Sequence, residues 1–109
     1  MTRVILESPW RGNVARNLGY LNRCLLDSVS RGEAPIASHK IFPGVLDDYE
    51  PEQREVGIEA GLAWVPVAEK MVVYTDYGIS DGMENAMSRA RLHNIPIELR
   101  EINERGVKG

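Results

Sequence analysis

The chain has 109 residues and a mass of 12.2 kDa, and its 16 acidic and 13 basic residues give a formal charge of −3. That charge argues against a binder of long nucleic acids, which needs a basic surface to neutralise phosphates. Hydrophobic residues make up 43% of the chain, enough for the packed core of one domain and too many for wholesale disorder. No apolar run approaches the ~20 residues of a membrane span, the first residues carry too few apolar side chains for a signal peptide, and a single cysteine, Cys24, excludes an internal disulfide.

The first third of the chain predicts a strand, a helix and a second strand. Residues 4–6 form a short apolar run of the kind found in buried parallel strands. Asn13 is a good helix N-cap, apolar residues then recur at helical spacing as far as Leu25, and Gly32 is placed to end the helix. Residues 35–38 predict a second strand with a weaker apolar pattern.

The middle of the chain predicts a long irregular loop followed by a helix. Residues 39–50 have the length of a binding or lid loop, in which Asp47 and Asp48 either bind ribose hydroxyls or, as is commoner, form a solvated pair. Pro51 suits the first turn of a helix, which Pro66 should kink or end. Its apolar residues fall on two faces, Val56, Ala60, Ala63 and Val67 on one and Ile58, Leu62 and Val65 on the other. A helix that is apolar on two sides is usually buried on two sides, so we expect a homo-oligomer, a dimer or higher.

The last third predicts a strand, a third helix and a final strand. Residues 71–74 are the clearest strand of the chain, and Ser80 or Asp81 is expected to cap the helix that follows. The spacing of Asp81 and Glu84 resembles a capping box. Residues 95–99 alternate as a strand, and a proline within them favours an edge position.

This alternation predicts the fold class α/β, as a small open parallel Rossmann-like sheet of about four strands with three helices. We expect one domain over residues 1–102 and a polar C-terminal tail, residues 103–109, that frays.

The candidate site lies where such sheets bind ligands, at the carboxyl ends of the strands beside helix N-termini. The predicted ligand-binding residues are Ser8, Pro9, Trp10, Arg11, Asn13, Ser38, His39, Asp76, Tyr77, Gly78, Ser80, Asp81, Gly82 and Met83. Aromatic faces stack on bases, arginine pairs with phosphate, and helix N-termini offer N–H groups to anions. The set is typical of a site for a nucleotide, nucleoside or sugar phosphate. No second histidine or cysteine lies at metal-ligand spacing, so we expect neither a metal nor another cofactor.

Several of these residues have equally ordinary structural roles. Trp10 is about as often a cover for a helix as a stacking platform, and Arg11 fits a solvated loop charge. A lone histidine such as His39 is more often hydrogen-bonded structure than a catalytic base. Asp81 and Glu84 are at least as well explained as helix-capping residues as by acid–base chemistry.

Three segments carry a family resemblance. Ser8-Pro9-Trp10-Arg11-Gly12, residues 78–83 (Gly-Ile-Ser-Asp-Gly-Met) and Ile95-Pro96-Ile97 resemble the nucleoside 2-deoxyribosyltransferase-like superfamily, which includes small phage and bacterial members. The resemblance covers residues 4–99 and implies the fold predicted above.

The resemblance also implies an enzyme that cleaves N-glycosidic bonds of deoxynucleosides with a glutamate on the last helix. Matching the family's Asp-Ser-Gly-Thr-x-x-Glu pattern at Gly82 places its ribose-binding aspartate at Ser80 and its nucleophile at Ala86. Neither carboxylate is present, and an alanine cannot attack an anomeric carbon. Asp81 is displaced, and Glu84 lies two residues before position 86, about 200° around a helix.

Three functions remain open at this point. The first is a binder of a nucleotide, nucleoside or ADP-ribose-type ligand that does not turn it over. If the chain is phage-encoded, we expect such a binder to act as an anti-defence protein that sequesters a host signalling nucleotide in the host cytoplasm. The alternative is an N-glycosidase or nucleoside deoxyribosyltransferase acting through Glu84 or Asp81. The third is an interaction module that uses the two-faced helix. For all three we expect a cytoplasmic protein without a membrane or long nucleic acid as partner.

Overall fold

The structure is a computed structural model that describes residues 1–103, so most of the predicted tail lies outside the described residues. The strands are β1 (Thr2–Glu7), β2 (Glu33–Ile36), β3 (Lys70–Tyr74) and β4 (Ile97–Arg100). The helices are α1 (Val14–Ser30), α2 (Ser38–Ile41), α3 (Pro51–Leu62) and α4 (Asp81–Leu92), with single 3-10 turns at Phe42–Gly44 and Val65–Val67. The strands form one sheet in the order β2-β1-β3-β4, and every pairing is parallel. The predicted α/β fold with a four-stranded parallel sheet is confirmed.

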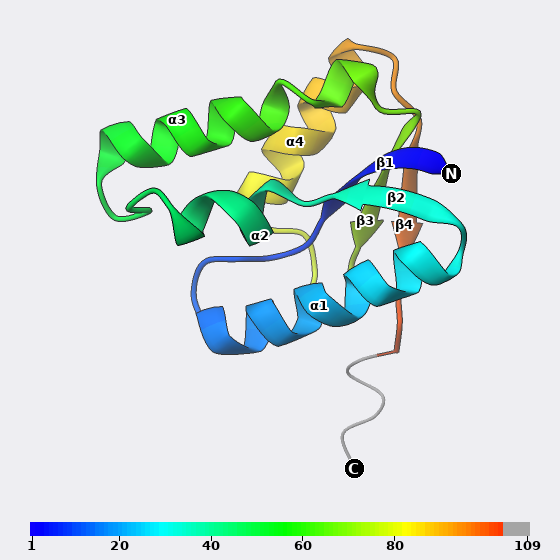
Figure 1. Cartoon of the computed structure of the whole chain (residues 1–109), viewed down its shortest axis with the longest axis horizontal. Helices are drawn as coiled ribbons and strands as arrows, with labels where there is room; N and C mark the ends of the chain where they lie inside the picture. Colours follow the sequence, from blue (N-terminus) through cyan, green and yellow to red (C-terminus); the bar gives the residue numbers. More distant parts are fainter. Residues whose placement is uncertain (104–109) are drawn as a thin grey trace.

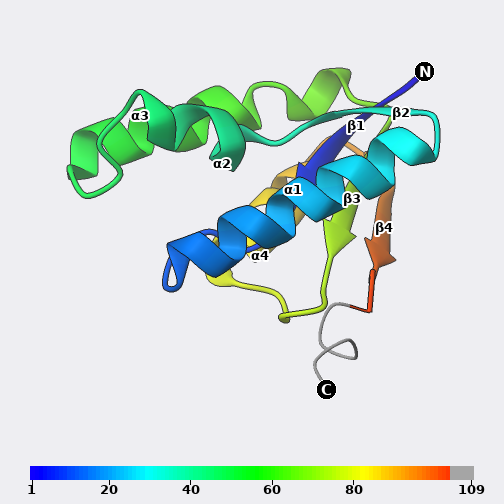
Figure 2. The same ribbon diagram turned by 60° about the horizontal axis from the view of Figure 1, so that its bottom comes forward.

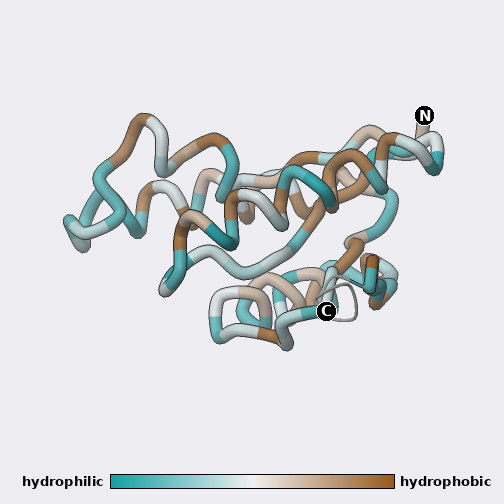
Figure 3. Tube along the Cα trace, turned by 90° about the horizontal axis from the view of Figure 1, so that it is seen from below, coloured by the Kyte–Doolittle hydropathy of each residue, from teal (hydrophilic) through white to brown (hydrophobic). Residues whose placement is uncertain are grey.

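Helices cover both faces of the sheet (Figures 1 and 2). Helix α1 packs on one face, where Val4, Leu6, Val72 and Tyr74 point, and α3 and α4 pack on the other face, where Ile5, Met71 and Val73 point. Successive residues of a strand point to opposite faces, so β1 and β3 serve both cores. Figure 3 shows that hydrophobic and hydrophilic residues are also interspersed along the rest of the trace.

The helix ends agree with the sequence in two places and differ in one. Asn13 caps α1 by accepting a hydrogen bond from the backbone N–H of Arg16 at 3.0 Å. Ser80 caps α4 by accepting one from the N–H of Met83 at 3.3 Å. The capping box expected between Asp81 and Glu84 is therefore wrong, because the cap lies one residue earlier and its reciprocal partner is the Met83 sulfur.

The middle of the chain departs most from the prediction. Residues 39–50 are not wholly irregular, because α2 begins at Ser38 and a 3-10 turn follows it. The second strand ends at Ile36 rather than continuing to Ser38. Helix α3 ends at Leu62, before Pro66, which sits at the start of the next 3-10 turn, where a missing N–H costs nothing.

The two apolar faces of the α3 region have different environments. Leu62 and Val65 are buried against the sheet, whereas Val56 and Val67 are 59% and 55% exposed. The expected burial on both sides is thus present on one side only within a single chain, and the homo-oligomer stays a prediction. Strand β4 lies at an edge of the sheet, as Pro96 in the predicted strand 95–99 favours, but it begins after that proline, at Ile97, and runs to Arg100. Within residues 1–103 there is no helix with both the length and the apolar character to cross a membrane.

Candidate functional site

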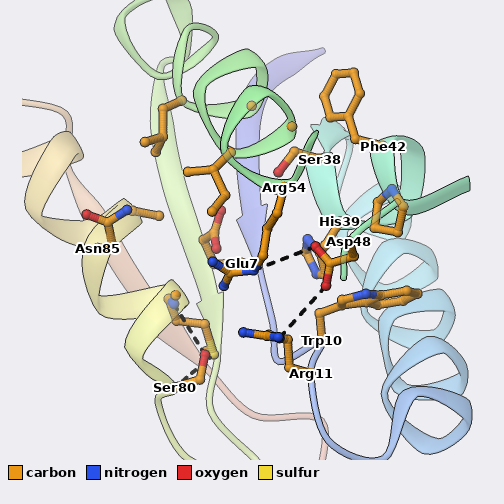
Figure 4. Close-up of a pocket in the computed structure, with 18 of the residues that line it drawn as sticks. Glu7, Trp10, Arg11, Ser38, His39, Phe42, Asp48, Arg54, Ser80 and Asn85 are labelled. Atoms are coloured by element: carbon orange, nitrogen blue, oxygen red, sulfur yellow. Dashed lines mark hydrogen bonds and ion pairs between the residues drawn. The ribbon is translucent and has the colours of Figure 1, made fainter. Parts of the chain in front are cut away.

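A pocket of about 440 Å³ opens at the carboxyl ends of β1 and β2, between α2, α3 and the start of α4 (Figure 4). Its size lies within the range of small-molecule sites. The predicted residues that line it are Ser8, Trp10, Arg11, Ser38, His39, Ser80, Asp81, Gly82 and Met83. The loop after β1, helix α2 after β2 and the N-terminus of α4 therefore meet around one cavity.

The close approach of two helices fixes one wall of the pocket. Gly61 of α3 faces Ser38 at the start of α2, and a Cβ at position 61 would stand 2.5 Å from the Ser38 Cβ. No real side chain tolerates that distance, so only glycine lets α3 lie this close to the start of α2. Gly61 thus sets the distance between α2 and α3 at this wall of the cavity.

The other predicted residues, Pro9, Asn13, Asp76, Tyr77 and Gly78, do not line this pocket. Asp76 is buried on the α1 side, where its Oδ1 accepts hydrogen bonds from the Tyr20 hydroxyl and the N–H of Ile102. Tyr77 packs edge-on against Tyr20, and the Arg16 guanidinium lies 4.2 Å from its ring centre. Asp76 continues the alternation that turns Tyr74 towards α1, so strand periodicity predicts this placement.

Glu7 lies in the pocket and was not among the predicted ligand-binding residues. It is the last residue of β1, and it continues the alternation that points Ile5 to the α3–α4 face. Among residues 1–103, no hydrogen bond or ion pair reaches its carboxyl. Burial without a partner disfavours the charged form and raises the pKa of Glu7 to about 8. At neutral pH this carboxyl is mostly protonated and is able to donate a hydrogen bond.

His39 lines the same pocket as a neutral side chain. Its Nε2 shares a hydrogen bond of 2.7 Å with the hydroxyl of the buried Ser8, and the edge of Trp10 packs on its ring. Burial lowers the pKa of His39 to about 4, since no carboxylate compensates the cost of a buried cation. The structural role considered from the sequence, a hydrogen-bonded histidine, describes its place here.

Two arginines supply positive charge at the pocket. Arg11 comes from the loop after β1, and Arg54 comes from the first half of α3. Both guanidiniums face the carboxylate of Asp48, with Nε–O distances of 3.8 Å for Arg11 and 3.7 Å for Arg54 (Figure 4). Arg54 was missed from the sequence, because nothing local shows that its helix lies across from β1. No group of three or more histidine, cysteine or acidic residues in the described part of the chain is arranged to hold a metal ion.

Residues 2–100 match the model of a protein family described as a domain of unknown function (DUF7768). The chain belongs to that family. No curated protein sequence matches this DUF7768 chain. Among solved structures, it is similar to a 2-deoxyribosyltransferase from the psychrotolerant bacterium Bacillus psychrosaccharolyticus, with a TM-score of 0.67 and 14% identity over 92% of this chain and 72% of that one. The fold-level resemblance stated from the sequence is confirmed.

The DUF7768 chain has no carboxylate at the helix position that the resemblance assigns to the nucleophile. Ala86 is buried and lines the pocket, so the position assigned to the nucleophile faces the cavity but carries a methyl group in place of a carboxylate. Glu84 is exposed, lies outside the pocket and pairs with Arg91. Asp81 lines the pocket at the N-terminus of α4. Of the two carboxylates considered for catalysis, only Asp81 therefore reaches the cavity.

Proposed function

We propose that the pocket binds a small nucleotide-like ligand, a nucleoside, nucleotide or ADP-ribose-type molecule, without turning it over through a carboxylate of α4. The observation that carries the proposal is the meeting of an aromatic ring, two guanidiniums and a helix N-terminus around one cavity at the strand ends. Trp10 offers a stacking surface for a base, and Arg11 and Arg54 offer donors to phosphate. We assign Ser80 and Asp81, which line the pocket at the N-terminus of α4, to the ribose hydroxyls; this end of a helix also favours anions.

The absence of a carboxylate at Ala86 supports binding over turnover. A cytoplasmic protein that binds such a ligand and leaves it intact sequesters it. In a phage protein the ligand we propose is a host signalling nucleotide, held as an anti-defence measure. We also propose that the exposed apolar face around Val56 and Val67 is covered by a second copy of the chain.

A thermal-shift panel of nucleosides, nucleotides, ADP-ribose and cyclic dinucleotides tests binding, because a ligand that binds only the folded state raises the melting temperature. We expect at least one member to stabilise the protein. Trp10→Ala should then weaken its binding about tenfold or more, since stacking on a base is worth ~1–3 kcal/mol. Trp64→Ala is the matched control, because Trp64 is half-exposed and lies outside the pocket. Stabilisation by no member, or equal effects of the two tryptophan variants, would contradict the proposal.

The Glu7 carboxyl favours a second candidate function, hydrolysis of an N-glycosidic bond. A protonated carboxyl in a nucleoside-sized pocket is a suitable general acid. In the proposed step, Glu7 gives its proton to a ring nitrogen of the leaving base, and the C1′–N bond breaks with its electron pair going to the base. Water then adds to C1′ and returns a proton to the Glu7 carboxylate. In this scheme Glu7 takes the place of Asp81 and Glu84.

Chromatography of nucleosides and nucleotides after incubation with the protein separates the two candidates. Cleavage by Glu7 predicts a released base, loss of release in Glu7→Gln, and a rate that falls as the pH rises through about 8. Glu84→Gln should keep full activity, because Glu84 lies outside the pocket. Release of the base that persists in Glu7→Gln would point to Asp81 instead. If no ligand that binds releases its base, the cleavage function is wrong and binding without turnover is supported.

A further inference from the structure

The pocket already contains an anionic group of the protein between its two arginines. Asp48, in the loop before α3, presents Oδ2 to Arg11 and Oδ1 to Arg54, so each carboxylate oxygen faces one guanidinium. Arg11 and Arg54 come from different sides of the cavity, and Asp48 bridges them (Figure 4). A single carboxylate therefore occupies the point where the positive charge of the pocket converges.

This bridge is loose. Its N–O distances of 3.8 and 3.7 Å exceed the 2.7–2.9 Å of a charge-assisted hydrogen bond. The Arg11 side chain is 58% exposed, so water screens its half of the bridge. Each guanidinium carries five N–H donors in a planar fork, and one distant carboxylate oxygen does not satisfy that fork. The two arginines are therefore available to an anion that reaches them more closely.

The loop around Asp48 is tethered on both sides. The N–H of Asp47 donates to Gln53 Oε1 at 2.9 Å, and the N–H of Tyr49 donates to Asp47 Oδ1 at the same distance. The backbone on either side of Asp48 is thus held, while among residues 1–103 its own side chain is bound only by the two loose ion pairs. Rotation of this one side chain is enough to vacate the space between the arginines.

We propose that Asp48 is an internal substitute for the phosphate group of the ligand, and that a phosphate-bearing ligand displaces it from Arg11 and Arg54. A phosphate has three terminal oxygens for the two guanidiniums, against two carboxylate oxygens. It cannot bind beside Asp48 without strong like-charge repulsion, so the two anions exclude each other. Asp48 consequently lowers the affinity of the site for every anion, most of all for anions too weak to displace it, and leaves the affinity for a neutral nucleoside unchanged.

The test compares the dissociation constants of inorganic phosphate, a nucleoside and its 5′-monophosphate for the wild type and for Asp48→Asn. We expect Asp48→Asn to bind inorganic phosphate and the monophosphate about tenfold more tightly and the nucleoside equally well. Glu52→Gln is the matched control, since it removes one negative charge from an exposed position outside this pocket. Its affinities should stay within about twofold of the wild type. Adding Arg54→Gln to Asp48→Asn should abolish the gain.

The proposal is overturned if Asp48→Asn gains no affinity for phosphate, if Glu52→Gln gains as much, or if no phosphate binding occurs in any variant. The ligand's identity rests on the proposed function, but inorganic phosphate tests the anion position alone. A gain for phosphate without binding of any nucleotide would support the Asp48 exchange and contradict the proposed function. Nucleotide binding that Asp48→Asn leaves unchanged would support the proposed function and contradict the Asp48 exchange.

Discussion

Two glutamates of adjacent strands, Glu33 and Glu7, lie on opposite faces of the sheet in opposite electrostatic states. Glu33, at the start of β2, is buried, and it receives hydrogen bonds from both terminal nitrogens of Arg100 and from the Ser28 hydroxyl, with Lys70 3.3 Å away. These donors lower its pKa to about 2. Glu7, at the end of β1, has no such partner among the described residues, and burial raises its pKa to about 8. Burial alone therefore does not decide the charge of a carboxyl; the donors around it do.

The comparison separates a structural carboxylate from a candidate functional one. On the α1 face, Arg100 reaches across from the edge strand β4 to Glu33 and also donates to the Tyr74 hydroxyl, which itself donates to Asp27. The hydrogen bonds of that cluster join β2, β3 and β4 to one another and to α1. On the α3–α4 face, the half-buried carboxyl of Glu7 lines the pocket and has no donor among residues 1–103. Strongly perturbed pKa values cluster at functional sites, so Glu7 is a candidate functional residue.

The largest expected effect comes from breaking the structural pair. Arg100→Met leaves Glu33 buried without its bidentate partner, so we expect the free energy of unfolding to fall by about 3–5 kcal/mol. Urea denaturation followed by circular dichroism measures this loss. Arg91→Met is the control, because its ion pair with Glu84 is exposed and should be worth less than about 1 kcal/mol. Equal losses in the two variants would mean that the Glu33–Arg100 pair has no special structural role.

The second prediction concerns the loss of stability at low pH. The pKa of Glu33 is lower in the folded than in the unfolded chain, so its contribution is present above the unfolded pKa of 4.5 and is lost as the pH falls towards about 2. We expect up to about 3 kcal/mol of stability to disappear over that window. Glu33→Gln should flatten this part of the profile of unfolding free energy against pH. A Glu33→Gln profile that falls as steeply as the wild type would assign the acid sensitivity to other carboxyls.

The sequence predicted the fold of this molecule better than its candidate site. Strand and helix alternation gave the sheet, and cap residues such as Asn13 gave the start of α1, because those signals depend only on neighbours in the chain. Helix α2 was missed because a four-residue helix has too few turns to show a period. Its existence depends on packing against α3, where Gly61 makes room for Ser38.

The site was predicted as a set of loops, and only part of that set meets. Position at a strand's carboxyl end is readable from the sequence, but the face to which each side chain turns requires counting along the strand. That count separates Asp76, which turns to α1, from Glu7, which turns to the pocket. Arg54 could not be found this way, because its nearness to Arg11 and Asp48 is a property of the tertiary fold. The pKa of Glu7 likewise follows from missing donors, which no sequence displays.

The smallest expected effect concerns Glu7, the carboxyl that has no donor in the comparison with Glu33. The pKa of Glu7 is higher in the folded chain than in the unfolded one, so its contribution to stability is present below pH 4.5 and is lost as the pH rises through about 8. The pocket admits water, so we expect Glu7→Gln to gain only about 1–2 kcal/mol over the wild type at pH 9. The gain should vanish below pH 4.5, where both side chains are neutral. Glu84→Gln, as an exposed control, should show no such trend. If Glu7→Gln instead destabilised the protein at pH 9, the Glu7 carboxylate would be stabilised there, and the acid role in the pocket would be wrong.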